Sequence, residues 1–228
     1  MLEKLKKIKR VPFGKDFFHK TTIQINNKKI GSDYGGWWIS TDNLDNKSLV
    51  VFSFGLGEDI SFDTGMMETY TCKVYGFDPT PKSIKYVESM TLNDKFSLYK
   101  YALSSDNGTL TFNLPANEEH VSGSLENISS NNQIEVACKN LKTICQELEI
   151  NEIDILKMDI EGSEYRVVEN MMKSKIFPRQ ILIEYHHFFD SFENKNTIES
   201  IELLINNGYE LFHIDGYNYS FIKGDLNR

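Results

Sequence analysis

The sequence predicts a doubly wound α/β domain with a mostly parallel sheet, and three segments carry that prediction. Residues 49–54, LVVFSF, form a compact apolar strand that runs into the glycine turn 55–59, and a helical pattern follows. Residues 73–78, KVYGFD, form a second apolar strand that ends in an acid. Residues 153–160 form a third, whose near-continuous apolar run suits a strand buried on both faces. Strands and helices that alternate in this way are typical of a parallel sheet covered by helices.

The segment 153–172 is the centre of the predicted site. Asp159 and Glu161 stand where its strand should end, and Gly162 allows a sharp turn before Ser163, the expected N-cap of a helix. Apolar residues then repeat at helical spacing as far as residue 172. Open α/β sheets bind ligands at the carboxyl ends of their strands. We therefore expect the chemistry near these two carboxylates.

The other two strands end in features that suit a nucleotide-like cofactor. The turn 55–59 would bring the backbone and a helix N-terminus close to a ligand. Asp78 follows about 20 positions later, where an acid can accept hydrogen bonds from two vicinal ribose hydroxyls. Asp78 before Pro79 can also open a turn in which Thr80 caps the next helix, and the two roles are compatible.

The rest of the chain continues the alternation. Strands are expected at 96–103, 109–117, 180–185, 209–214 and 218–222, and helices at 136–149 and 196–207. Residues 118–132 are polar and suit either a substrate-side loop or a plain surface loop. The strand 180–185 ends in a second group of functional side chains, Glu184, His186 and His187.

Residues 1–48 are predicted to be an N-terminal extension of the domain 49–228. The first ten residues suit a solvated amphipathic helical turn, with contact to a membrane surface as the alternative. A short hairpin is expected at 21–30. The corner Gly35-Gly36-Trp37-Trp38 suits either a core plug or a lid over a ligand.

Composition excludes several classes of function. The formal net charge of -8 argues against a nucleic acid partner, since a polyanion would be repelled by the overall field. The three cysteines form no CxxC pair, which suits free thiols in the cytoplasm. No apolar run approaches the roughly 18 residues of a membrane span, so we expect no integral membrane association.

Three blocks of sequence follow one another over roughly 49–187. They are VVFSFGLGEDISFD at 50–63, YGFDPTP at 75–81 and LKMDIEGSEYRVVENM at 156–171, and GSDYGGWWI at 31–39 precedes them. In content and order these blocks resemble the S-adenosylmethionine-dependent methyltransferases of the FkbM family, in the branch whose first motif starts with SFG. The resemblance does not extend to a particular substrate.

The resemblance implies a Rossmann-like class I methyltransferase fold, with a doubly wound, mostly parallel, seven-stranded sheet and a C-terminal antiparallel hairpin. It implies S-adenosyl-L-methionine as cofactor and O-methylation of a hydroxyl on a sugar, a glycan or a small metabolite. The residues it assigns to cofactor binding are Phe54, Gly55, Gly57, Glu58, Asp59, Asp78, Pro79, Ala102, Leu103, Asp159, Glu161 and Gly162. The chain departs from the common pattern at Ser53, where many such enzymes carry an acid, and at Asp59, which replaces a glycine. Glu58, Asp59 or Asp63 is then expected to contact the amino group of the cofactor.

The candidate catalytic residues are His186, Asp159 and Glu184. An imidazole titrates near neutral pH, so His186 is the expected base or acceptor-orienting group; a buried loop histidine without a catalytic role is the alternative. Together with Glu161 these side chains could hold Mg²⁺ or Mn²⁺, although a metal is not favoured. Lys157, a charge within an apolar strand, is expected to be a paired structural lysine.

Two other functions fit parts of the pattern. An NAD-dependent oxidoreductase would also use a glycine turn and Asp78, but the chain lacks GxGxxG. A catalytically silent nucleotide-binding module is the second alternative. A homo-oligomer is possible in each case.

Overall fold

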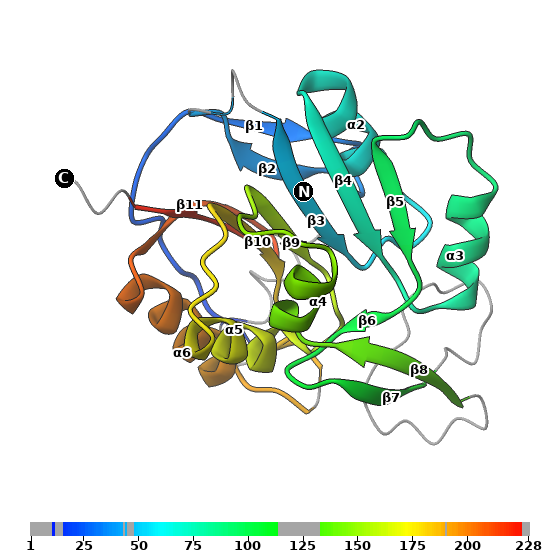
Figure 1. Ribbon diagram of the computed structural model, residues 1–228. Coiled ribbons are helices and arrows are strands. Elements are labelled where there is room, and N and C mark those ends of the chain that lie inside the picture. Colours follow the sequence, from blue (N-terminus) through cyan, green and yellow to red (C-terminus); the bar gives the residue numbers. More distant parts are fainter. Residues whose placement is uncertain are drawn as a thin grey trace.

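The computed structural model describes residues 11, 16–42, 44, 48–113, 133–189 and 191–224. Its centre is a seven-stranded sheet with the order β11-β12-β10-β9-β3-β4-β5 (Figure 1). Its strands, in chain order, are β3 (Leu49–Phe54), β4 (Cys72–Phe77), β5 (Phe96–Tyr99), β9 (Ile155–Met158), β10 (Gln180–Glu184), β11 (Tyr209–Asp215) and β12 (Asn218–Lys223). Neighbouring strands from β5 to β10 are parallel, whereas β12 runs antiparallel to both β10 and β11. The predicted mostly parallel sheet with a C-terminal antiparallel hairpin is confirmed.

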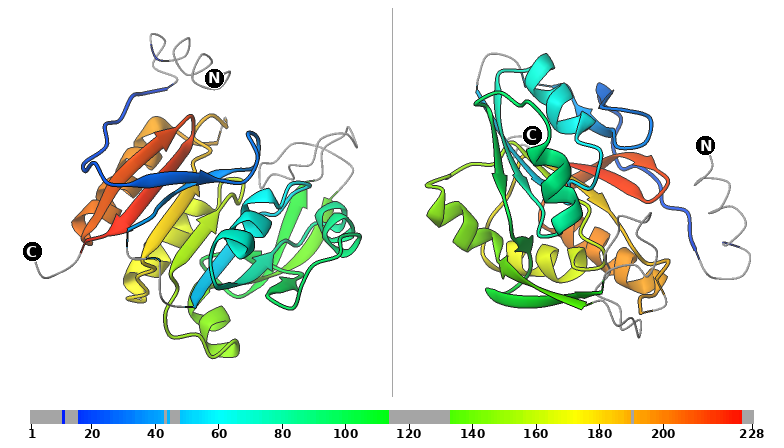
Figure 2. Two further views of the ribbon diagram at one scale, coloured as in Figure 1. Left: turned by 90° about the horizontal axis from the view of Figure 1, so that it is seen from above. Right: turned by 90° about the vertical axis from the view of Figure 1, so that its right-hand side faces the viewer.

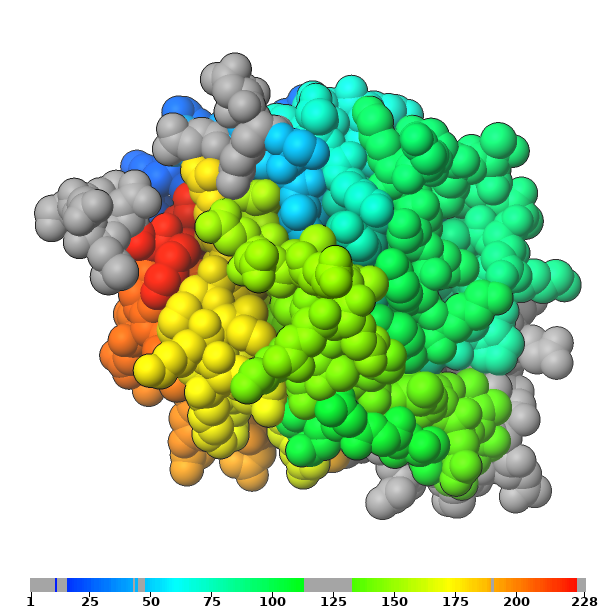
Figure 3. Space-filling model, viewed as in Figure 1, coloured from blue at the N-terminus to red at the C-terminus, as the bar shows by residue number. Residues whose placement is uncertain are grey.

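One face of the sheet is covered by helices of the second half of the chain, α4 (Leu141–Glu147), α5 (Glu164–Lys173) and α6 (Asn194–Asn206). Figure 3 shows this face, on which α4 and α5 adjoin. Their apolar side chains pack with Phe52, Leu156 and Ile181 from the strands beneath them. These strand residues face the helices because successive side chains of a strand point to opposite faces of the sheet.

The opposite face is covered by α2 (Ser61–Thr69) and by a hairpin of β1 (Asn27–Ile30) and β2 (Trp37–Ser40). Figure 2 shows the hairpin lying across the strands of the C-terminal half of the sheet. Gln180 fixes it there, because its side chain both accepts from the Ser40 N–H at 2.8 Å and donates to the Ser40 carbonyl at 2.9 Å. Helix α3 (Pro81–Glu88) packs through Val87 against Leu56 and Ile60.

A smaller sheet of β6 (Ala102–Leu103), β8 (Gln133–Lys139) and β7 (Gly108–Asn113) lies beyond the end of β5. It corrects two predictions. The expected strand 96–103 is divided between the two sheets, and the expected helix 136–149 begins only at Leu141, after β8. Residues 133–139 form a strand because their alternating side chains pair with β7, and Asn140 then starts α4 by accepting a hydrogen bond from the Thr143 N–H at 2.9 Å.

The N-terminal predictions have mixed outcomes. The expected hairpin at 21–30 is wrong, because β1 pairs with β2 across the Gly35-Gly36 corner. Trp37 is a core residue that also faces the ligand cavity described below, and Trp38 stacks on His213 with ring centroids 4.1 Å apart. The first ten residues, the polar loop 118–132 and the end of the expected strand 109–117 lie outside the described residues. None of the described helices is long and apolar enough to cross a membrane.

Candidate functional site

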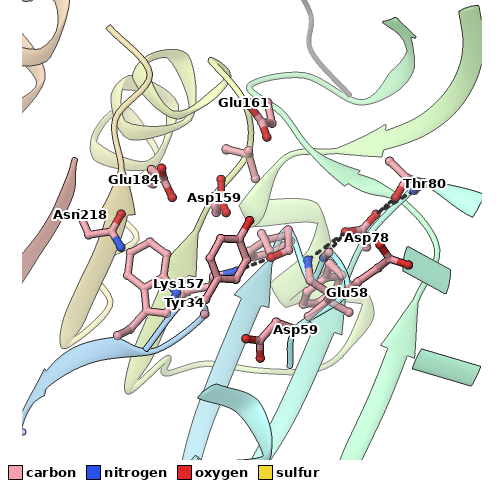
Figure 4. Close-up of a pocket in the computed structure, with 18 of the residues that line it drawn as sticks. Tyr34, Glu58, Asp59, Asp78, Thr80, Lys157, Asp159, Glu161, Glu184 and Asn218 are labelled. Carbon is pink, nitrogen blue, oxygen red and sulfur yellow. Dashed lines mark hydrogen bonds between the residues drawn. The ribbon is translucent and has the colours of Figure 1, made fainter. Parts of the chain in front are cut away.

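A cavity of about 1090 Å³ opens at the carboxyl ends of β3, β4, β9 and β10. Eleven of the twelve residues assigned to cofactor binding line it, and so do two of the three candidate catalytic residues, Asp159 and Glu184 (Figure 4). The exceptions are Gly162 and His186. Gly162 is needed for the turn itself, since it has φ +100° and a Cβ there would lie 2.6 Å from the ring of Phe192. The central strands therefore bring together the three sequence blocks in one concave surface.

The glycine turn after β3 approaches the neighbouring strand so closely that a side chain is excluded. Gly55 has φ +79°, and a Cβ on it would lie 1.8 Å from the carbonyl oxygen of Asp159. The same turn is held from below by Lys157, whose ammonium donates to the Gly55 carbonyl. Gly55 is therefore required by the close packing of this turn against Asp159, and that packing fixes the turn at the wall of the cavity.

Asp78 is tied to this turn. One carboxylate oxygen accepts from the N–H groups of Leu56 and Gly57 at 2.9 and 3.2 Å. The other accepts from the N–H and hydroxyl of Thr80 at 2.8 and 2.6 Å, so the predicted turn role is present, and Thr80 occupies the N-cap position of α3 without a side-chain cap bond. Asp78 lines the cavity with 4% of its surface exposed. Its contact with a ribose stays a prediction.

The two acids that follow the glycines have separate partners. Glu58 forms an exposed ion pair with Lys82 at 2.9 Å. Asp59 accepts from the Ser32 hydroxyl at 2.6 Å and the Ser61 N–H at 2.8 Å. Burial acts to raise the pKa of Asp59, but the hydrogen bonds from Ser32, Ser61 and Gly35 outweigh it and hold the pKa below its usual value. Asp59 thereby fastens the loop 32–36 to the glycine turn.

Asp63, the third acid proposed for the amino group, lies under the site. It is 2% exposed, does not line the cavity and faces Lys157 of β9 from α2. Burial raises the pKa of Asp63 to about 6, and the positive charge of Lys157 opposes that rise. Asp63 therefore lies outside the cavity, away from its expected contact with the cofactor, and it interacts with Lys157 through its charge.

His186 lies behind the cavity wall among three carboxylates. Its Nδ1 is 3.2 Å from Glu164 Oε1, and its Nε2 is 3.3 Å from Glu161 Oε2 and 3.6 Å from Asp159 Oδ1. Burial lowers the pKa of His186, but these carboxylates outweigh burial and raise it to about 10. An imidazolium with that pKa cannot accept a proton at neutral pH. The geometry therefore favours a role in holding Asp159 and Glu161 over the predicted role as base.

Glu164 supports this arrangement from the start of α5. It is fully buried and accepts from the N–H groups of Gly162 and His186, both at 2.9 Å. Ser163 occupies the predicted N-cap position but makes no side-chain cap bond. Ligand atoms of Asp159, Glu161 and His186 lie within 4.8 Å of one another, which is the spacing of a cation site, but the protonated His186 itself supplies the positive charge there. Glu184 is not part of that group.

The structure adds lining residues that the sequence motifs did not indicate. The apolar end of the cavity contains Phe77, Tyr86 and Phe112 beside the predicted Ala102 and Leu103. The opposite end contains Asp215 and Asn218 of the C-terminal hairpin. Tyr34 lies at the rim and is 91% exposed. Tyr34 directly precedes the Gly35-Gly36 corner, which the sequence indicated as a core plug or a lid. Asp215 lies in the turn between the last two strands, and no sequence motif indicated it as a site residue.

Comparison with known proteins identifies the family. The model of the methyltransferase FkbM domain matches residues 54–211. The chain belongs to the FkbM methyltransferase family. Its cofactor is S-adenosyl-L-methionine, and its seven-stranded sheet has the class I methyltransferase order.

The FkbM chain also matches individual proteins. Probable methyltransferase-like protein 24 of Homo sapiens is 27% identical over 158 residues, and its Rattus norvegicus counterpart is 26% identical over 157. The matches cover 68% of this chain but only 37% and 38% of those relatives. Among solved structures, the Methanococcus jannaschii fibrillarin pre-rRNA processing protein is 10% identical to this chain, with a TM-score of 0.47. The match covers 79% of this chain and 69% of the fibrillarin chain. Aeropyrum pernix fibrillarin in complex with S-adenosyl-L-methionine has 12% identity and a TM-score of 0.43 over 78% and 66%.

Proposed function

We propose that this FkbM chain transfers the methyl group of S-adenosyl-L-methionine to a hydroxyl of a sugar, a glycan or a small metabolite. The observation that carries the proposal is the single cavity in which the glycine turn, Asp78, Asp159 and Glu184 meet. Its volume of about 1090 Å³ leaves room for a cofactor and an acceptor side by side. Cytoplasmic location is part of the proposal, since Cys72, Cys138 and Cys145 are all free thiols.

The residues present fit the cofactor. Gly55 and Gly57 line the cavity, and the apolar side chains of Phe77, Ala102 and Leu103 offer a surface for a planar base. Asp78 and Glu58 lie between these two features and are the candidates for the ribose hydroxyls. When bound, the cofactor supplies an electrophilic methyl group on a sulfonium.

The acceptor end of the cavity fits a hydroxyl. Asp159 and Glu184 present carboxylates from neighbouring parallel strands, and Asn218 adds an amide. In an in-line displacement, the acceptor oxygen forms its bond to the methyl carbon as the bond from carbon to sulfur breaks, and the hydroxyl proton passes to a carboxylate. His186 keeps Asp159 and Glu161 oriented while that happens.

The first experiment is calorimetric titration of S-adenosylhomocysteine and, separately, of NAD into the purified protein. Binding of S-adenosylhomocysteine alone supports the proposal, and binding of NAD alone supports the oxidoreductase instead. Asp78→Ala would disturb the glycine turn as well as any ribose contact, because Asp78 accepts from two N–H groups there. Glu58→Gln is therefore the better variant for testing a ribose contact, because it removes only an exposed ion pair and leaves the hydrogen bonds of the glycine turn intact.

The second experiment tests methyl transfer. Formation of S-adenosylhomocysteine is measured with a panel of hydroxylated acceptors, for the wild type and for Asp159→Asn and Glu184→Gln. Loss of a base lowers kcat/KM by about 10²–10⁴-fold, so one of the two variants should lose activity on that scale while still binding S-adenosylhomocysteine. Cofactor binding without turnover on any acceptor would favour the silent binding module.

A further inference from the structure

Lys157 is a cation at the floor of the cavity. It belongs to β9, two residues before Asp159, and lines the cavity although only 6% of its surface is exposed. Its ammonium donates to the Gly55 carbonyl and lies 5.5 Å from the centre of the Trp37 ring. The lysine side chain therefore reaches the underside of the glycine turn, between that turn and the N-terminal hairpin.

A buried acid outside the cavity interacts with the ammonium. Asp63 faces it from α2, is buried, and is not among the residues that line the cavity. One oxygen of Asp63 makes no hydrogen bond to any described residue. An ammonium has three donors, and the Gly55 carbonyl takes one of them. Lys157 thus has a buried acid behind it and retains donors beyond the one that binds the Gly55 carbonyl.

The remaining charge of the cavity is strongly negative. Eight acids line it, and they are Asp33, Glu58, Asp59, Asp78, Asp159, Glu161, Glu184 and Asp215. The lining lysines are Lys29 and Lys157, and Lys29 lies at the exposed rim, where it donates to the Asp33 carbonyl at 3.0 Å. Lys157 is thus the buried cation among the described lining residues, and a ligand carboxylate in this acidic cavity would be attracted to it.

The cofactor of the family carries such a carboxylate on its amino-acid tail. We propose that Lys157 receives the carboxylate of the cofactor's amino-acid tail, with Asp63 as the buried counter-charge that holds the ammonium in place. The glycine turn and the ring of Trp37 line the cavity beside Lys157, and the acids at the mouth suit the ammonium and sulfonium groups of the cofactor. This inference rests on the proposed cofactor binding and goes beyond it by assigning the cation that selects the complete tail.

The test compares two ligands that differ in the tail. S-adenosylhomocysteine has the amino-acid group, and 5′-methylthioadenosine has the same nucleoside without it. Calorimetry is carried out on the wild type, on Lys157→Met, which keeps the length of the side chain, and on Lys73→Met, which removes an exposed lysine of β4 outside the cavity. Lys157→Met should weaken S-adenosylhomocysteine at least tenfold and change 5′-methylthioadenosine less than twofold, whereas Lys73→Met should change neither.

Equal weakening of both ligands by Lys157→Met would overturn the proposal, because the lysine would then only shape the glycine turn. Unchanged affinity for both would overturn it as well. If Lys157→Met does not fold, the double variant Lys157→Met with Asp63→Asn is used instead, because it removes both buried charges together. A measurement without substitution completes the test: decarboxylated S-adenosylhomocysteine should bind the wild type about tenfold more weakly than the parent, and equal affinity overturns the proposal. If the wild type binds neither nucleoside, the proposed function itself has failed.

Discussion

Two buried cations stand on either side of Asp159, and they have opposite surroundings. Lys157 faces one buried acid and one carbonyl, and it lines the cavity. His186 faces three carboxylates and does not line the cavity. Burial alone therefore does not define the role of a charge. A cation with an excess of protein partners organises its neighbours, whereas one with donor capacity left can bind a ligand.

The largest expected effect comes from Glu164→Ala. This change leaves the His186 charge with less compensation and removes the acceptor of the Gly162 and His186 N–H groups. Breaking a buried pair by removal of one partner typically costs about 3–5 kcal/mol, and we expect the free energy of unfolding to fall by that amount in urea denaturation at pH 7. The control is Glu169→Ala on the same helix, where an exposed pair with Lys173 is worth at most about 1 kcal/mol. Similar losses in both variants would contradict the organising role of His186.

The pH dependence of stability tests the same group. The pKa of His186 is raised from 6.5 to about 10 by its carboxylates. Its contribution to stability is therefore complete below pH 6.5 and is lost as the pH rises toward 10. Wild-type stability should fall across that window more steeply than that of His186→Gln. Titration of the imidazole resonances by NMR gives the direct reading, and a His186 resonance that titrates near pH 6.5 would refute the assignment.

The fold could be predicted from the sequence because the strands are short apolar runs with turn residues at their ends. The glycine turn, Asp78 and Asp159 line one cavity because motif and strand end coincide at each of them, and their roles toward a ligand stay predictions. The helix predicted at 136–149 starts too early because residues 133–139 form a strand by pairing with β7. Spacing within the segment itself does not reveal that distant partner strand.

The partners of charged side chains were beyond reach of the sequence. Asp63 and Lys157 are 94 positions apart and meet only because α2 packs on the face to which Lys157 points. His186 was correctly placed beyond a strand tip, but its charge state depends on Glu164, which the sequence indicated only as a first-turn acid. Periodicity reports which face a residue occupies and does not report what lies opposite it.

Asp63→Asn should have a smaller effect than Glu164→Ala. The change removes the negative charge opposite Lys157 together with the cost of burying an ionised carboxylate, and because the raised pKa means that this cost is the larger of the two, we expect the free energy of unfolding to rise by about 1–3 kcal/mol at pH 7. Because burial raises the pKa of Asp63 from 3.8 to about 6, its protonation stabilises the folded state at low pH, and this stabilisation is lost as the pH rises through that window. The stability of the wild type relative to the variant should therefore increase as the pH falls from 6 toward 4. A constant difference between the two proteins would show that Asp63 does not titrate in this range.

The smallest effect is expected at the exposed pair of Glu58 and Lys82, which forms the outer counterpart of these buried groups. Their side chains are 38% and 40% exposed and 2.9 Å apart, so water and salt screen the attraction. Glu58→Gln and Lys82→Met should each change the free energy of unfolding by less than about 1 kcal/mol, and the coupling in a double-mutant cycle should shrink further in 1 M salt. A coupling as large as the loss from Glu164→Ala would mean that exposure does not separate the two kinds of charge. A small coupling together with weaker S-adenosylhomocysteine binding by Glu58→Gln would instead place Glu58 among the ligand contacts, because an acid that contributes little to the fold can still hold a ribose.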